Sequence, residues 1–387
     1  GIPTVMGAES LPYARLNGVE LVVDGYRGLL YSNPSDELRM QFQAIYEEEQ
    51  ALAQDLEGLL HKPATTLDGH RLPLWVNTGL ITDALRSLDR GAEGVGLYRT
   101  EVPFMMKERF PSEQEQREIY REQLQAFSPA PVTMRTLDIG GDKSLAYFPI
   151  TEANPFLGWR GIRVTLDHPE IFLVQVRAML KASEGLNNLR IMLPMVSNVT
   201  EVDQALHLIY RAHMEVLEEG FDVEVPEVGV MIEVPAAVYQ IPELAERVDF
   251  LSVGSNDLTQ YLLAVDRNNP RVADLYQAFH PAVLQALKRI VDEAHALNTP
   301  VSVCGELAGN PMGAVLLMAM GYDILSMNAT NLPKVKSVVR GISKEWAERL
   351  LQEVMVMESA QVIASTLQLM LEKAGFGRII GPVIKGG

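Results

Sequence analysis

The stretch Val228-Gly229-Val230-Met231-Ile232-Glu233 is a short apolar run that ends in a carboxylate. A continuous apolar run of this kind is typical of a strand that is buried on both faces of a parallel sheet. Seven similar runs are Leu74–Val76, Val95–Leu97, Val132–Leu137, Ile191–Leu193, Phe250–Val253, Val301–Val303 and Ile324–Leu325. Amphipathic helical stretches between them include Glu115–Phe127, Thr200–Glu219 and Ala282–Ala296. Eight buried strands that alternate with helices predict an α/β fold, a closed (β/α)8 TIM barrel. An open doubly wound sheet is the alternative, but no dinucleotide-binding glycine fingerprint follows the first strand.

The chain before the barrel has a different pattern. Its first 34 residues are expected to be extended, with a hairpin around the loop Asp24-Gly25-Tyr26-Arg27-Gly28. This hairpin is too small to bury a core, so residues 1–34 are expected to end a domain whose body lies upstream. Ser35 or Asp36 can cap a following helix that reaches about His61, where Lys62-Pro63 ends it. We therefore expect a linker helix over 35–62 and the barrel over 63–387.

The composition excludes several classes of partner. The 387 residues include 33 basic and 50 acidic side chains, so the formal net charge is 33 − 50 = −17. Such a chain repels nucleic acid and anionic lipid, and no basic run or membrane-length apolar stretch offsets this. One cysteine cannot form an internal disulfide, which suits a reducing cytoplasm.

Two carboxylates at the ends of neighbouring strands are candidate metal ligands. Glu233 follows the fifth predicted strand and Asp257 follows the sixth. Functional residues of a parallel barrel gather at these carboxyl ends, so both side chains can meet there. Two hard oxygen ligands suit Mg²⁺ or Mn²⁺ and do not suit zinc. The alternative is that each carboxylate caps a helix or pairs with an arginine.

Four arginines from separate places are expected at the same end of the barrel: Arg99, Arg135, Arg160 and Arg267. Guanidinium groups bind carboxylate and phosphate through two parallel hydrogen bonds, so several of them indicate a small substrate with multiple negative charges. A surface salt bridge is the alternative for any one of them. Gly140-Gly141 offers backbone N–H groups to a phosphate, although such a pair is usually a turn.

Cys304 is the only thiol, and it follows the seventh predicted strand. A lone cysteine is most often a small buried apolar residue, but at a strand end a protonated thiol can act as a general acid on carbon. Seven histidines are present, none in a loop that favours a nucleophilic imidazole, and we expect none to be catalytic.

Six ordered blocks of sequence are informative together. They are Gly94-Val95-Gly96-Leu97-Tyr98-Arg99-Thr100-Glu101, Arg135-Thr136-Leu137-Asp138-Ile139-Gly140-Gly141-Asp142-Lys143, Asn154-Pro155-Phe156-Leu157-Gly158-Trp159-Arg160, Glu233-Val234-Pro235-Ala236-Ala237, Gly254-Ser255-Asn256-Asp257-Leu258-Thr259-Gln260-Tyr261 with Asp266-Arg267, and Cys304-Gly305-Glu306-Leu307-Ala308-Gly309. These blocks resemble enzyme I of the bacterial phosphoenolpyruvate phosphotransferase system, and the resemblance extends from the N-terminal hairpin to about residue 340. Details such as Leu97-Tyr98 and Ser255 resemble the nitrogen-type paralogue more than the sugar enzyme.

The resemblance implies a barrel that binds phosphoenolpyruvate with Mg²⁺, releases pyruvate and forms a homodimer. It implies that Glu233 and Asp257 hold the metal and that Cys304 protonates the enolate carbon. It also implies a substrate-binding set of Arg99, Arg135, Arg160, Asn256, Asp257 and Arg267.

In the family, a swivelling domain carries the phosphorylated histidine shortly before the Ile2-Pro3 segment and passes the phosphoryl group to a histidine phosphocarrier protein. Residues 1–34 would be the remnant of that domain. The acceptor histidine and the carrier-docking helices are then expected to be missing, and the chain alone should not transfer phosphate.

Three other interpretations stay open at this point. The barrels of pyruvate phosphate dikinase and phosphoenolpyruvate synthase share this chemistry. A non-catalytic phosphoenolpyruvate sensor module and an aldolase that forms a pyruvate enolate are the other two.

Overall fold

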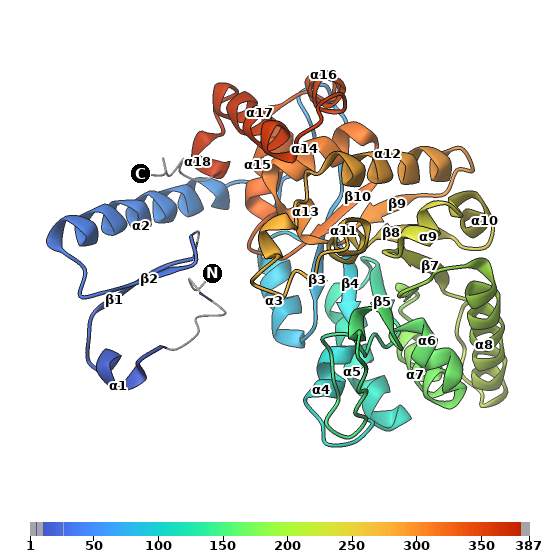
Figure 1. Ribbon diagram of the computed structural model, residues 1–387. Helices are drawn as coiled ribbons and strands as arrows, with labels where there is room; N and C mark the ends of the chain where they lie inside the picture. The colour runs from blue at the N-terminus through green and yellow to red at the C-terminus, as the bar shows by residue number, and fades with distance from the viewer. Residues whose placement is uncertain (1–4, 6–10, 26, 381–387) are drawn as a thin grey trace.

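The computed structural model describes residues 5, 11–25 and 27–380, and its centre is a closed barrel of eight parallel strands (Figure 1). Each strand pairs with its neighbours in chain order, and β10 closes the barrel onto β3. The strands are β3 Leu74–Thr78, β4 Val95–Arg99, β5 Val132–Arg135, β6 Leu189–Leu193, β7 Glu227–Ile232, β8 Phe250–Val253, β9 Val301–Val303 and β10 Ile324–Met327. The predicted TIM barrel is confirmed, and all eight predicted apolar runs are strands of it.

The strands are apolar on both faces because each face packs against a different part of the core. Outward-facing residues such as Val230 and Val253 belong to a large core shared with the surrounding helices. Inside the barrel, a smaller cluster consists of Leu97, Met192, Met231, Phe250 and Cys304. The third predicted strand ends at Arg135, two residues early, and the chain then leaves the sheet with Asp138 fully buried.

Helices surround the barrel, and polar side chains fix several of their first turns. Ser112 accepts a hydrogen bond from the Glu115 N–H at the start of α5, and the Glu115 carboxylate accepts one from the Ser112 N–H. The helices of the barrel are α3 Ile81–Asp89, α4 Glu101–Met105, α5 Glu113–Phe127, α6 Ile162–Asp167, α7 Pro169–Ser183, α8 Val199–Glu218, α9 Pro235–Val238, α10 Ile241–Ala245, α11 Ser255–Leu263, α12 Pro281–His295, α13 Glu306–Gly309, α14 Pro311–Met320, α15 Leu332–Gly341, α16 Lys344–Val354, α17 Ala360–Lys373 and α18 Gly377–Ile380, with 3-10 turns η1 Pro155–Leu157 and η2 Ala273–Leu275.

The N-terminal segment lies beside a helix that projects from the barrel (Figure 1). The predicted hairpin is present as β1 Leu21–Asp24 and β2 Leu29–Ser32, and Ser35 caps α2, Asp36–Glu57. The expectation of a wholly extended start is wrong, because α1 forms over Tyr13–Leu16. Residues 1–4, 6–10 and Tyr26 of the predicted segment lie outside the described residues.

The helix α2 ends at Glu57, before the predicted end near His61. Just beyond it, the Leu60 carbonyl accepts a hydrogen bond of 2.7 Å from the buried Lys336 ammonium on α15. A Cβ on Gly91, whose φ is +74°, would lie 1.8 Å from the same carbonyl oxygen. The helix α2 therefore ends just before the segment that contacts the barrel through Lys336.

Among the described residues, no helix is long and apolar enough to cross a membrane.

Candidate functional site

The charged residues of the site lie at the carboxyl ends of the barrel strands. Arg99 and Arg135 are the last residues of β4 and β5, and Glu233 directly follows β7. Asp257 lies in the first turn of α11, which begins two residues after β8 ends. Parallel strands bring all these positions to one face of the barrel, as the sequence predicted.

Arg160 joins two parts of the site through buried ion pairs. Its side chain is fully buried; its Nη1 lies 2.8 Å from Asp257 Oδ1 and its Nε lies 3.2 Å from Asp138 Oδ1. Burial alone would lower the pKa of Arg160, but Asp138 and Asp257 more than offset this, so its pKa is raised. The guanidinium is therefore a permanent cation that holds the loop after β5 against α11.

Arg135 has an equally buried environment. Its Nη2 lies 2.6 Å from Glu101 Oε1 and 3.1 Å from Asp138 Oδ2, while its Nε has no hydrogen-bond partner among the described residues. The Lys143 ammonium also pairs with Asp138 and lies 3.7 Å from Glu101 Oε1. Two cations thus share two buried carboxylates, and part of their hydrogen-bonding capacity is left for a ligand.

Glu233 is the least satisfied charged group of the site. It is fully buried, and its Oε1 accepts a hydrogen bond of 2.7 Å from the Met195 N–H, but its Oε2 has no hydrogen-bond partner among the described residues. Burial, with the nearby charges of Asp257 and Asp138, raises the pKa of Glu233 to about 7. Despite its own burial, Asp257 has a lowered pKa because Arg160 and Arg267 lie beside it. The protein alone therefore disfavours the ionised form of Glu233.

This arrangement fits a divalent oxygen-loving cation. A buried carboxylate oxygen without a partner is costly, and a bound cation would remove that cost. No group of three His, Cys, Asp or Glu side chains able to hold a metal occurs in the described part of the chain. A cation held by Glu233 and Asp257 would thus keep positions for water and substrate oxygens, as Mg²⁺ commonly does.

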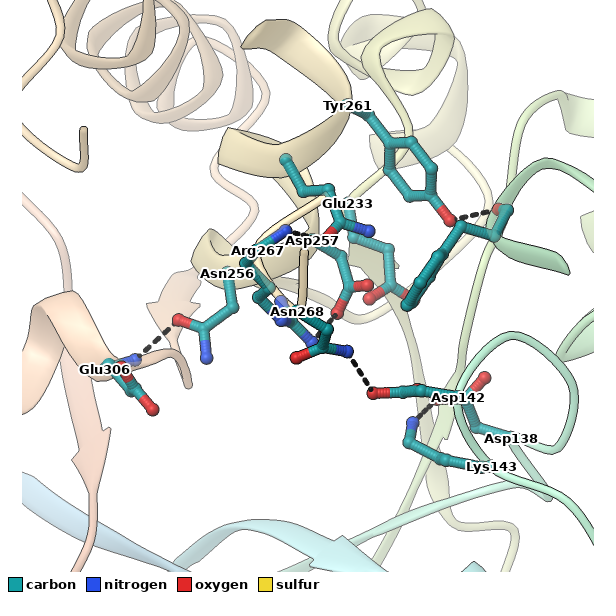
Figure 2. A network of polar contacts seen from close by, with 12 residues as sticks. Asp138, Asp142, Lys143, Glu233, Asn256, Asp257, Tyr261, Arg267, Asn268 and Glu306 are labelled. Carbon is teal, nitrogen blue, oxygen red and sulfur yellow. Dashed lines mark hydrogen bonds and ion pairs between the residues drawn. The ribbon is translucent and has the colours of Figure 1, made fainter. Parts of the chain in front are cut away.

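Arg267 faces Asp257 from the loop after α11. Its Nη2 lies 3.7 Å from Asp257 Oδ2, and its Nη1 has no hydrogen-bond partner in the described structure. The next residue, Asn268, reaches across to the loop after β5 and donates to Asp142 Oδ2 at 3.4 Å (Figure 2). Both loops that carry cations are thereby connected.

A separate polar recess contains Cys304, Arg99 and Asn256. Arg99 is exposed, and among the described residues it forms no ion pair with the buried carboxylates. The four predicted arginines therefore divide into a group of three and Arg99 alone. Asn256 Oδ1 accepts a hydrogen bond of 2.9 Å from the Glu306 N–H (Figure 2). Asn77 on β3 donates through Nδ2 to the Cys304 carbonyl at 2.8 Å. The turn that carries Cys304 is therefore fixed from two sides.

Burial raises the pKa of the Cys304 thiol to about 11, so the thiol is protonated at neutral pH. Its Sγ lies 3.6 Å from the Val253 carbonyl oxygen. The next residue has to be glycine, because a Cβ on Gly305 would lie 1.8 Å from Ser255 Oγ. The turn thus places a proton donor, and not a thiolate nucleophile, beside the recess.

Several residues of the site are not among those predicted from the sequence. The sequence offers a signal for Asp138, Glu101 and Lys143, because they are charged residues beside apolar strands. Burying a charge there is costly unless it is paired. Met195 had no such signal: its backbone has a left-handed φ of 59°, and it acts through its N–H. In the part of the chain that the structure describes, none of the seven histidines forms a hydrogen bond or ion pair with a site residue.

The family described as PEP-utilising enzyme, PEP-binding domain, matches residues 53–344, from the second half of α2 through β10 and α15. The chain belongs to this family. The match includes every residue of the predicted site.

Curated relatives are similar over nearly the whole chain. The "Phosphoenolpyruvate-dependent phosphotransferase system" protein of Escherichia coli is 47% identical over 98% of this chain and 51% of its own length. The "Phosphoenolpyruvate-protein phosphotransferase" of Geobacillus stearothermophilus is 39% identical over 94% of this chain and 63% of its own length. The chain thus spans between half and two thirds of the length of these relatives, which are of the enzyme I type that the sequence resembled.

Among solved structures, a HpcH/Hpal aldolase/citrate lyase family protein from Burkholderia cenocepacia aligns with 78% of this chain and 98% of its own. The TM-score is 0.41 and the sequence identity is 16%, which is too low to support any argument on function.

Proposed function

We propose that this chain binds phosphoenolpyruvate together with Mg²⁺, or with Mn²⁺ in its place, at the carboxyl ends of the barrel strands. The observation that carries the proposal is the unpartnered, fully buried Glu233 Oε2 beside cations that retain free donors. The family and the names of the relatives support the same ligand. In the complete protein we expect the phosphoryl group to pass to a histidine, leaving pyruvate.

The arginines of the site would have different roles in binding a trianionic ligand. Arg135 and Arg267 retain N–H groups that no described residue accepts from, and Arg160 is held between Asp138 and Asp257. Arg135 and Arg267 therefore would bind phosphate or carboxylate oxygens directly, while Arg160 would hold Asp257 in place. A metal bound to Glu233 and Asp257 would supply positive charge that offsets repulsion between these carboxylates and the ligand.

The recess would hold the other end of the substrate. Arg99 and Asn256 line it together with Cys304, so we place the methylene carbon there. Loss of the phosphoryl group leaves pyruvate enolate. The Cys304 S–H bond then breaks, its proton forms a C–H bond at the methylene carbon, and the enolate becomes the ketone. A thiol with a pKa of about 11 is available in the protonated form that this step needs.

We propose that the phosphoryl acceptor is a histidine outside these 387 residues. The histidines of this chain lie elsewhere: His213 contacts the Val223 carbonyl and His295 contacts Asp323. We further propose that residues 1–34 belong to the swivelling domain that carries the acceptor and that 35–62 connect it to the barrel. The next recipient would be a histidine phosphocarrier protein.

Three finer assignments accompany this proposal. Leu97-Tyr98 and Ser255 favour the nitrogen branch of the phosphotransferase system. We also propose a homodimer formed through the barrel domain, as the family resemblance implies, and a cytoplasmic location, where a free thiol stays reduced.

Calorimetric titration with phosphoenolpyruvate tests the proposal. Binding should be strong with Mg²⁺ and much weaker with excess EDTA, and Glu233→Gln should weaken it in Mg²⁺. Equal affinity in Mg²⁺ and EDTA would contradict the metal site. Glu243→Gln, an acidic side chain on α10 away from the cluster, is a matched control that should bind normally.

Phosphoryl transfer needs its own experiment. The chain alone should release no pyruvate from phosphoenolpyruvate, whereas adding a separately expressed histidine-bearing swivelling domain should restore slow transfer. Loss of the tether lowers the effective concentration of the acceptor, which makes the reaction slow. Rapid pyruvate release without that domain would show that the acceptor lies within this chain.

A further inference from the structure

A buried serine on β8 faces the same interior as Cys304. Residues alternate between the two faces of a strand, so Ser252 shares the inward face with Phe250, which packs against Cys304 inside the barrel. The Cys304 sulfur lies 3.6 Å from the carbonyl oxygen of Val253, the residue after Ser252. Ser252 is 1% exposed, so its hydroxyl has no access to solvent.

The Ser252 hydroxyl differs from the serine hydroxyls on the next two strands of the barrel, Ser302 on β9 and Ser326 on β10. Ser302 is its paired neighbour on β9, and Ser302 donates to the Leu251 carbonyl at 3.4 Å. Ser326 on β10 donates to Asn77 Oδ1 at 2.6 Å. Ser252 Oγ has no well-formed hydrogen bond to any described residue. A buried hydroxyl without a partner is costly, so its presence in a packed barrel needs a reason.

The Cys304 sulfur faces the same barrel interior and lies beside the carbonyl of the next residue of the strand, so it is the group on which this hydroxyl can act. Burial raises the pKa of the thiol, and the Ser252 hydroxyl is the strongest opposing influence, ahead of the positive charge of Arg135. Glu233 raises that pKa and Arg99 lowers it. In its protonated form, the thiol donates toward the Val253 carbonyl oxygen. A second donor beside the sulfur gains a strong acceptor only after the thiol has lost its proton.

We propose that Ser252 is a positioning residue whose hydroxyl donates a hydrogen bond to the Cys304 thiolate formed when the thiol protonates the pyruvate enolate. The inference rests on the proposed function. Cys304 Sγ loses its proton to the methylene carbon and keeps the bonding electron pair. The Ser252 O–H stays intact and turns toward the negative sulfur. Ser252 thereby lowers the free energy of the product state without contacting the substrate.

The reverse half-reaction gives an assay that needs no phosphoryl acceptor. With Mg²⁺ and pyruvate in D₂O, the thiolate removes a methyl proton and returns deuterium after exchange with solvent, which proton NMR follows. A hydrogen bond to a charged group contributes on the order of a tenfold to hundredfold change in equilibrium. Ser252→Ala should slow the exchange by about that factor. Ser302→Ala, its paired neighbour, should leave it unchanged, and Ser252→Thr should restore most of it.

A second readout needs neither metal nor substrate. Cys304 is the only cysteine, so its alkylation by iodoacetamide reports the thiolate fraction directly. The alkylation rate between pH 7 and 9 should fall by a similar factor in Ser252→Ala and stay unchanged in Ser302→Ala. If Ser252→Ala does not fold, the isosteric variants Ser252→Thr and Ser252→Val make the same comparison, because only threonine keeps a hydroxyl.

Different outcomes test the proposed role of Cys304 and that of Ser252. Pyruvate exchange that persists in Cys304→Ala would contradict the proposed acid itself. If Cys304→Ala abolishes exchange while Ser252→Ala exchanges and alkylates like the wild type, the role of Ser252 is overturned and that of Cys304 stands. Equal losses in Ser252→Ala and Ser302→Ala would also overturn it, because a packing defect would then explain both.

Discussion

Arginines with largely buried side chains occur at both ends of the barrel, and their surroundings differ. At the amino ends of the strands, Arg190 lies 3.8 Å from the centre of the Phe250 ring and 5.5 Å from that of Trp75, and Glu227 is its partner. Burial lowers its pKa. At the carboxyl ends, the pKa values of Arg135 and Arg160 are raised because carboxylates surround them.

The difference lies in which polar atoms are left over. No nitrogen of Arg190 is among the unpartnered buried atoms of the described residues, whereas Arg135 Nε, Arg267 Nη1 and Glu233 Oε2 are. At the amino end, Arg190 packed with Trp75 and Phe250 thus forms a plug that stabilises the fold. The carboxyl end keeps charged groups with unpartnered atoms, which a bound cation and an anionic ligand would satisfy, at a cost in stability to the free protein. Mutations at the two ends should therefore separate folding from binding.

The largest effect is expected at the plug. Trp75→Ala should lower the free energy of unfolding by about 3–5 kcal/mol, because a large buried side chain is replaced by a cavity. The folded fraction should bind phosphoenolpyruvate normally. Denaturant unfolding and calorimetry measure the two quantities, with the exposed Tyr210→Ala as control. A parallel loss of affinity would show that the two ends are coupled.

The next effect is expected at the carboxyl end. Arg135→Lys keeps the charge but loses the planar donor pair, so affinity for phosphoenolpyruvate should fall roughly tenfold to hundredfold, or about 1.5–3 kcal/mol. The unfolding temperature should change little. Arg211→Lys, on the outer face of α8, is the matched control. An unchanged dissociation constant would remove Arg135 from the site.

The sequence predicted the barrel because its strands are apolar on both faces, and it placed Glu233, Asp257 and Cys304 at one end by topology alone. It did not predict which arginine does what. Arg160 is enclosed by Asp138 and Asp257, and Arg99 lies in the recess, and these differences depend on side-chain packing. The sequence gives no sign of the roles of Met195 and Ser252. Met195 acts through its backbone N–H, and Ser252 resembles any buried serine.

The pKa of Glu233 adds a test by pH. Below about pH 7 the metal-free carboxyl is protonated, so Mg²⁺ must displace a proton and its affinity should fall by up to about tenfold per pH unit as pH decreases.

The stability of the metal-free protein should change with pH in the opposite direction. The folded pKa exceeds the ordinary 4.5, so the metal-free protein should lose stability as pH rises through about 7. Calorimetry with Mg²⁺ and thermal unfolding in EDTA measure these slopes; flat profiles that match those of Glu233→Gln would contradict the assignment.

The smallest effect is expected from Arg190→Lys. The ammonium retains the charge beside Phe250 and Glu227 but stacks less well, so the loss in unfolding free energy should be about 0.5–1 kcal/mol. Binding of phosphoenolpyruvate should not change. This contrasts with Arg135→Lys, the same substitution at the opposite end, and an equal effect on binding would erase the distinction between the ends.

The central claim is that Glu233 and Asp257 hold a divalent cation with phosphoenolpyruvate at the carboxyl end of the barrel. A crystal grown with Mn²⁺ and phosphoenolpyruvate tests it most directly, because Mn²⁺ gives an anomalous signal at its own position. We predict one strong peak between the two carboxylates, with the ligand's phosphate or carboxylate oxygens near Arg135 and Arg267. Ligand bound without an anomalous peak at these carboxylates, or a peak elsewhere in the protein, would contradict the account.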